Sequence, residues 1–227
     1  MRADMTAGAA AGVAAGPFRA AVFDLDGTLV DSESRSDAAW RRVFAARGMA
    51  SDDALIRSFV GRRGADVLGL LAEGVPGHDP AVLMAEASAQ FHDPGLPPLA
   101  PMPGAVELVR DLRAHDVPLG LVTSAGRRYA EQTLTLLGLR AAFSVVVTAG
   151  DVEVGKPDPE GYVRACWSLG VEAAACVGFE DAPAGVAAVK AAGMYCVAVA
   201  TTHEPGDLSE ADRVVADLAA VSWPLSP

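Results

Sequence analysis

Hydrophobic and polar positions divide the chain into stretches with two different patterns. Short, continuously apolar runs are typical of buried β-strands, and they occur at 20–23, 118–123, 143–147, 174–179 and 195–199. Apolar residues recur at helical spacing between these runs, at 104–114, 127–137, 159–169 and 182–192. Strands that alternate with helices in this way predict a mainly parallel sheet covered by helices on both faces. Residues 212–215 are a candidate for one further strand.

The stretch that follows the first strand is helical in pattern. Apolar residues recur at helical spacing over 36–47, 53–60, 65–71 and 80–91, and few strand signals appear. Prolines between 94 and 103 then indicate a stiff linker. We therefore predict an inserted all-helical cap domain over 34–100. The Rossmann-like core would comprise residues 17–33 and 101–227, and the leader 1–16, rich in Ala and Gly, would be disordered.

Composition narrows the class of protein. With 227 residues, 51% of them hydrophobic, the chain can bury a sizeable core. A net charge of -11 argues against nucleic acid and anionic membranes as partners, and no apolar stretch is long enough to span a membrane. The three scattered cysteines, Cys166, Cys176 and Cys196, are expected to be reduced core residues of a cytoplasmic protein. No unassigned apolar stripe remains, so a monomer is expected.

Two carboxylates follow the first predicted strand. Asp24 and Asp26 are two positions apart, so an extended backbone points both side chains to one face. Two neighbouring carboxylates repel each other unless a cation lies between them or one keeps a proton. The pair therefore indicates a cation site, a proton-transfer site, or both.

The later strands also end in polar residues. Thr123-Ser124-Ala125-Gly126 follows the second predicted strand, Gly155-Lys156-Pro157 follows the third, and Glu180-Asp181 follows the fourth. In open sheets with parallel strands, ligands bind beyond the carboxyl ends of the strands. The sequence therefore predicts carboxylates, a hydroxyl group and an ammonium group at one edge of the sheet.

These motifs, in this order, resemble the haloacid dehalogenase-like hydrolase superfamily, in the branch with a helical cap after the first strand. The motif set is Asp-x-Asp-Gly-Thr at 24–28, Thr-Ser at 123–124, Lys-Pro at 156–157 and Glu-Asp at 180–181. Residues 178–186 and 200–203 are most similar to sugar-phosphate and polyol-phosphate phosphatases, and more distantly to beta-phosphoglucomutase. The resemblance implies a phosphatase that acts on a small phosphorylated metabolite.

The resemblance also implies a role for each catalytic residue. Asp24 would attack phosphorus to give an aspartyl-phosphate, which divides one difficult displacement into two easier steps. Asp26 would protonate the leaving alcohol oxygen and then activate water. Lys156 would offset negative charge in the transition state, and the Thr123 hydroxyl would donate to the phosphoryl oxygens.

The metal and phosphate ligands follow from the same resemblance. Mg²⁺ would be held by a carboxylate oxygen of Asp24, the backbone carbonyl of Asp26 and the carboxylate of Asp181, with Glu180 assisting directly or through water. Gly27, Ser124 and Ala125 are the candidate phosphate-binding residues; Ser124 and Ala125 would offer backbone amides at the start of a helix.

The predicted cap leaves alternatives open. Arg62 and Arg63 follow Gly61 and would either bind an anionic or hydroxyl-rich part of the substrate or remain solvated. The mutase relatives carry a proton-shuttling histidine in the first cap helix, where this chain has Ser36, which favours transfer of the phosphoryl group to water. A sugar phosphomutase and a non-catalytic binding protein of the same fold are the alternative functions.

Overall fold

A computed structural model describes residues 18–59, 62, 64–72, 79–91 and 93–225. Its main sheet is six-stranded, in the order β5-β4-β1-β6-β7-β8, and every neighbouring pair is parallel. The strands are β1 (Ala20–Phe23), β4 (Leu119–Val122), β5 (Val145–Val147), β6 (Cys176–Glu180), β7 (Tyr195–Val199) and β8 (Arg213–Val215). The predicted Rossmann-like class is therefore confirmed. The leader 1–16 lies outside the described residues.

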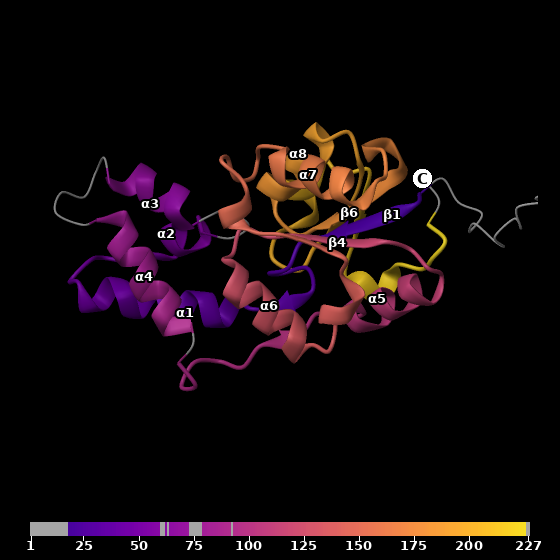
Figure 1. The fold of residues 1–227 in the computed structure, drawn as a ribbon. Helices are drawn as coiled ribbons and strands as arrows, with labels where there is room; N and C mark the ends of the chain where they lie inside the picture. Colours follow the sequence, from indigo (N-terminus) through magenta and orange to yellow (C-terminus); the bar gives the residue numbers. More distant parts are fainter. Residues whose placement is uncertain (1–17, 60–61, 63, 73–78, 92, 226–227) are drawn as a thin grey trace, which may run out of the picture.

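The sheet is covered on both faces, as the apolar runs predict. Its helices are α5 (Ala105–Ala114), α6 (Arg127–Leu136), α7 (Glu160–Leu169) and α8 (Pro183–Ala191). Ala21 and Phe23 of β1 join the core with α5 and α6, whereas Ala20 and Val22 join the core with α7 and α8. This alternation follows from the two-residue period of a strand. Figure 1 shows the two helix pairs on opposite sides of the strands.

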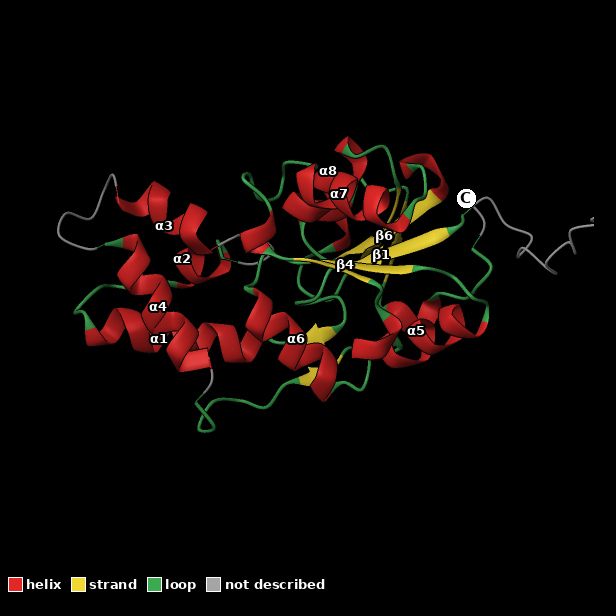
Figure 2. Ribbon diagram, in the orientation of Figure 1, coloured by secondary structure: helices red, strands yellow, loops and turns green. Residues whose placement is uncertain are grey.

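Four helices form a separate group at one end of the molecule (Figures 1 and 2). They are α1 (Glu33–Ala46), α2 (Asp53–Arg57), α3 (Gly64–Ala72) and α4 (Pro80–Phe91). They pack around a hydrophobic cluster of their own, in which the Trp40 and Phe59 rings stack with centroids 4.1 Å apart. We call residues 33–91 the cap helices. The domain division at 34–100 stays a prediction.

The connections between cap helices and sheet differ from the sequence prediction in one respect. The proline-rich segment contains a short strand, β3 (Ala100–Pro101), which pairs antiparallel with β2 (Val30–Asp31). Pairing needs a partner far away in the sequence, so local composition alone does not reveal it. Arg35, in the first turn of α1, donates to the carbonyl oxygens of Phe91, Asp93 and Pro97. It thereby ties α1 to the chain that leaves α4.

The structure also bears on the cysteines and on the length of the helices. Cys166, Cys176 and Cys196 are buried and free, as predicted. Among the described residues, no helix has the length and the hydrophobicity needed to cross a bilayer.

Candidate active site

Asp24 lies at the carboxyl end of β1, in the middle of the sheet. Its amide donates to the Phe179 carbonyl of β6 (3.0 Å), which extends the strand pairing to the residue before the turn. The residue is 4% exposed. Burial raises the pKa of this carboxyl well above its usual value; the Lys156 ammonium opposes the shift, and the Glu180 and Asp181 carboxylates add to it. Asp24 therefore needs additional positive charge to be ionised.

Lys156 is the positive charge that already lies beside Asp24. Its ammonium pairs with the Asp24 carboxylate and lies 2.5 Å from Oε1 of Glu180, and the lysine is 6% exposed. Burial lowers the pKa of Lys156, but the two carboxylates raise it more, so the side chain stays charged. Tyr162 of α7 also donates to Glu180 Oε1. Glu180 is the last residue of β6, so the strand extends one residue beyond the predicted end at 179.

Asp181 is held by two threonines. Thr28 Oγ1 donates to Oδ1 (3.0 Å) and Thr202 Oγ1 donates to Oδ2 (2.5 Å). Gly27, with φ +81°, makes room for this carboxylate, because a Cβ at that position would lie 2.2 Å from Asp181 Oδ2. Burial, followed by the charge of Glu180, raises the pKa of Asp181 to about 7. Gly27 is thus required both for the positive φ of the backbone and for the space that the Asp181 carboxylate occupies.

The carboxylates of Asp24, Glu180 and Asp181 form a buried acidic cluster. One oxygen from each lies within 4.8 Å of the others. When ionised, three carboxylates and the Lys156 ammonium leave two negative charges in a buried site. Hard oxygen ligands with this charge fit a divalent cation of the Mg²⁺ type. These residues therefore fit the magnesium ion that the sequence motifs imply.

The Asp26 carboxylate is directed elsewhere. Its Oδ1 accepts hydrogen bonds from Ser32 Oγ (2.6 Å) and Tyr129 OH (2.7 Å). It is not a member of the acidic cluster, so the two carboxylates have different partners although both line one cavity. Burial raises the pKa of Asp26, while the two hydroxyl groups lower it. A raised pKa suits a carboxyl that gives up a proton.

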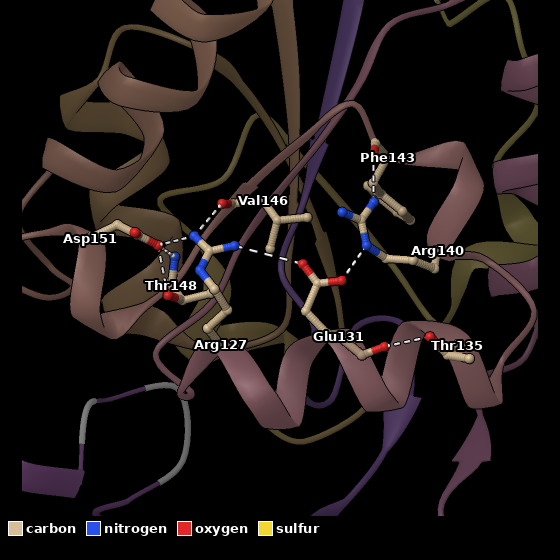
Figure 3. A network of polar contacts seen from close by, with 8 residues as sticks. All are labelled: Arg127, Glu131, Thr135, Arg140, Phe143, Val146, Thr148 and Asp151. Carbon is tan, nitrogen blue, oxygen red and sulfur yellow. Dashed lines mark hydrogen bonds and ion pairs between the residues drawn. The ribbon is translucent and has the colours of Figure 1, made fainter.

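The loop from Thr123 to Gly126 joins β4 to α6. Thr123 Oγ1 accepts from the Ala125 amide (3.0 Å), so that amide is engaged within the loop. The start of α6 is fixed by Arg127, whose Nη2 donates to Asp151 Oδ2 (2.6 Å) and to the Val146 carbonyl (3.1 Å). Figure 3 shows this network, which continues through Glu131 to Arg140. The network anchors the loop from outside the site.

A cavity of about 270 Å³ connects the strand ends with the cap helices. The core contributes Asp24, Asp26, Ser32, Thr123, Ser124, Ala125, Gly126 and Tyr129, and the cap helices and their turns contribute Glu33, Ser36, Trp40, Phe59, Arg62, Gly64, Met84, Ala87, Ser88 and Phe91. Burial, followed by the charges of nearby aspartates, raises the pKa of Glu33 to about 7. The cavity therefore has an acidic and hydroxyl-bearing floor and a largely apolar cap side.

The structure brings most of the predicted site residues together. Asp24, Asp26, Thr123, Ser124, Ala125 and Arg62 line the cavity, and Lys156, Glu180, Asp181 and Gly27 lie directly behind its floor. Arg63 lies outside the described residues. The sequence interpretation missed Thr28, Ser32, Tyr129, Tyr162 and Thr202, which hold the acids in place. The local sequence could have indicated only Thr28 and Ser32, because these two residues follow closely after Asp24 and Asp26.

The chain is similar to known proteins over most of its length. The family model described as haloacid dehalogenase-like hydrolase matches residues 18–193. The validoxylamine A 7'-phosphate phosphatase of Streptomyces hygroscopicus subsp. limoneus is 45% identical over 207 residues, which cover 91% of this chain and 97% of that protein. Hexitol phosphatase A of Escherichia coli K12 is 33% identical, and the match covers 91% of this chain and 94% of that protein. The crystal structure of a hydrolase from Pseudomonas syringae superposes with a TM-score of 0.79 at 26% identity, covering 88% and 94%.

Proposed function

The chain belongs to the haloacid dehalogenase-like hydrolase family and is a phosphoric monoester hydrolase, and from this premise we propose that it hydrolyses a sugar or polyol phosphate with Mg²⁺ as cofactor. One observation carries the proposal. Asp24, at the floor of the cavity, is in contact with the Lys156 ammonium and belongs to a three-carboxylate cluster that fits a divalent cation. A nucleophile, a cation site and space for a small substrate thus meet at one point.

The first step transfers the phosphoryl group to the protein. A carboxylate oxygen of Asp24 attacks phosphorus while the bond from phosphorus to the leaving oxygen breaks and its electron pair goes to that oxygen. Asp26, which lines the same cavity, gives its proton to the leaving oxygen, so that an alcohol departs. The product on the protein is an aspartyl-phosphate at Asp24.

The second step returns the protein to its starting state. Asp26, now ionised, takes a proton from a water molecule as the water oxygen attacks phosphorus. The bond to Asp24 breaks, inorganic phosphate leaves and the Asp24 carboxylate is restored. Lys156 stays charged throughout and offsets the negative charge of the phosphoryl oxygens. Thr123 would donate its hydroxyl hydrogen to one of these oxygens.

The metal would be held by the carboxylates of Asp24 and Asp181, with Glu180 as the third member of the cluster and the Asp26 backbone carbonyl as a further ligand. When bound, Mg²⁺ supplies positive charge that keeps Asp24 ionised and attracts the phosphate. Glu180 is also bonded to Lys156 and Tyr162, so a role in fixing the lysine accompanies any ligand role.

The cap side of the cavity supports a sugar-sized alcohol. Its polar groups include the Ser36 hydroxyl and the Arg62 guanidinium, beside an apolar wall that includes Trp40 and Phe59. Hydroxyl-bearing rings and chains present both polar and apolar faces, so they match such a lining. The names of the two relatives point to the first compounds to test, which are validoxylamine A 7'-phosphate and hexitol phosphates.

Release of inorganic phosphate tests the proposal. The purified protein should release phosphate from members of a panel of sugar and polyol phosphates in Mg²⁺, and a chelator should abolish release. Asp24→Asn should also abolish it, whereas Asp31→Asn, an exposed aspartate of β2 in the same segment, should not. Unchanged turnover in Asp24→Asn would disprove the nucleophile and leave a non-catalytic binding protein as the better account.

A sugar phosphomutase is the second candidate, because the crystal structure of beta-phosphoglucomutase from Clostridium difficile has the same fold. Incubation with a hexose 1-phosphate separates the two reactions. We expect free phosphate. Accumulation of hexose 6-phosphate without phosphate would establish the mutase instead. Ser36, which lines the cavity on α1, offers no imidazole for a second proton transfer and favours hydrolysis.

A further inference from the structure

One oxygen of the Asp26 carboxylate is fixed by two hydroxyl groups. Ser32 Oγ and Tyr129 OH both donate to Oδ1, at 2.6 and 2.7 Å. A carboxylate oxygen has two lone pairs in its plane, so two donors fill its acceptor capacity. The proton that Asp26 gives and takes is therefore assigned to Oδ2, and the two hydroxyl groups determine where Oδ2 points.

Tyr129 is suited to hold a carboxylate in a fixed direction. It belongs to α6, and its ring meets the Phe91 ring edge-on, with centroids 5.2 Å apart and planes at 79°. Phe91 is the last residue of α4, and its carbonyl accepts from Arg35 Nε (2.8 Å). The tyrosine ring is thus held between a core helix and an anchored residue of the cap helices.

Both donors lie at the boundary between the core and the cap helices. Ser32 directly precedes α1, and Tyr129 contacts the residue that ends α4. Either connection would transmit a displacement of the cap helices to Asp26. The direction of the carboxylate is therefore set jointly by both parts of the molecule.

We propose that Tyr129 is a positioning residue for proton transfer: it fixes Oδ1 of Asp26 so that Oδ2 meets the leaving oxygen of the substrate. The inference rests on the proposed phosphatase function. In the step concerned, the Oδ2 proton passes to the leaving oxygen as its bond to phosphorus breaks. Tyr129 is not the proton donor in this step, and its hydroxyl group acts on the reaction through its hydrogen bond to Asp26.

The leaving group of the substrate provides the test. An alkyl phosphate such as a hexitol phosphate needs protonation of its leaving oxygen, whereas 4-nitrophenolate departs without it. Tyr129→Phe keeps the ring contact with Phe91 and removes the hydroxyl group. We expect kcat/KM for the alkyl phosphate to fall about tenfold or more, and kcat/KM for 4-nitrophenyl phosphate to change by less than about threefold. Tyr195→Phe, at the amino end of β7, is the matched control and should leave both constants unchanged.

The ratio of the two constants does not depend on how much of the variant is folded, so partial unfolding would not imitate the result. Ser32→Ala, which removes the other donor, should shift the ratio in the same direction. Equal losses on both substrates in Tyr129→Phe, or no loss on either, would overturn the proposal. Failure of the phosphatase function itself would look different: the unaltered protein in Mg²⁺ would release phosphate from neither substrate.

Discussion

The Nζ atom of Lys156 lies 2.5 Å from Oε1 of Glu180, and the same ammonium pairs with the Asp24 carboxylate. All three side chains are buried. A lysine shared between two acids serves two purposes here. It offsets repulsion between carboxylates that the fold forces together, and it places positive charge beside the proposed nucleophile.

Replacing this lysine should affect stability and activity together. Lys156→Met leaves two buried carboxylates without their counter-charge, and we expect the free energy of unfolding of the metal-free protein to fall by about 3 kcal/mol. Urea denaturation measures this. Lys190→Met is the control, since Lys190 pairs with Asp212 at the surface and should cost less than about 1 kcal/mol. The kcat/KM for phosphate release should fall about 100-fold or more in Lys156→Met alone.

Equal stability losses in the two lysine variants would contradict the role assigned to the buried pair. Retained activity in Lys156→Met would contradict its role in the transition state.

Tyr162 is the donor that completes the contacts of Glu180. Its side chain is fully buried in α7 and its hydroxyl group donates to Oε1. Tyr162→Phe removes one donor from a buried carboxylate, which we expect to lower the free energy of unfolding by about 1–3 kcal/mol. Urea denaturation of this variant measures the effect, with Tyr195→Phe as the control. A loss no larger than that of the control would show that Glu180 is satisfied without the Tyr162 hydroxyl group.

The contact between Gly27 and Asp181 predicts a specific loss of metal binding. In Gly27→Ala, the new methyl group would overlap Asp181 Oδ2, so the carboxylate must move. We expect Mg²⁺ affinity, measured by isothermal titration, to fall about tenfold or more. Gly48→Ala is the matched control: Gly48 also has a positive φ, of +65°, but nothing lies within 4 Å of its added Cβ. It should cost about 1–2 kcal/mol of backbone strain and leave Mg²⁺ binding intact.

Protons should compete with magnesium at Asp181. The folded, metal-free protein holds a proton there up to about pH 7, whereas the unfolded chain releases it near pH 3.8, the ordinary pKa of an aspartate. The folded state thus binds more protons in this window, and the contribution of Asp181 to stability decreases as pH rises through it. Mg²⁺ requires the ionised carboxylate, so its affinity should rise with pH by up to about tenfold per unit for each proton released.

Thermal melting with and without Mg²⁺, at about pH 6 and about pH 8, measures this competition. The stabilisation given by Mg²⁺ should be larger at the higher pH. Asp212→Asn, which alters a surface carboxylate of lowered pKa, should keep the same dependence. A stabilisation independent of pH would contradict the assignment of Asp181 as a ligand.

The sequence predicted the sheet and its strand-end residues because the relevant signals are local. Continuous apolar runs define the strands, and the topology then brings their ends to one edge. It did not predict the pairing of Val30 with Pro101 or the hydrogen bond from Tyr129 to Asp26, which join residues far apart in the sequence. The direction of the Asp26 side chain likewise depends on two hydroxyl groups outside its motif. Tyr162, at a helical apolar position, was indistinguishable from an ordinary core residue.

Arg62 offers a test of how the cap helices recognise the substrate. It lies in the turn after Phe59 and lines the same cavity as Asp24 and Asp26. A guanidinium that holds the part of the substrate that does not react would bind substrate and transition state equally, so Arg62→Ala should raise KM for a sugar phosphate about tenfold with little change in kcat. Arg57→Ala, an exposed arginine at the end of α2, should leave both unchanged. Arg62→Lys keeps the charge but not the planar fork, and it should recover only part of the loss. A fall in kcat at constant KM would instead place Arg62 in the phosphoryl-transfer step, and an unchanged KM would show that the arginine is solvated.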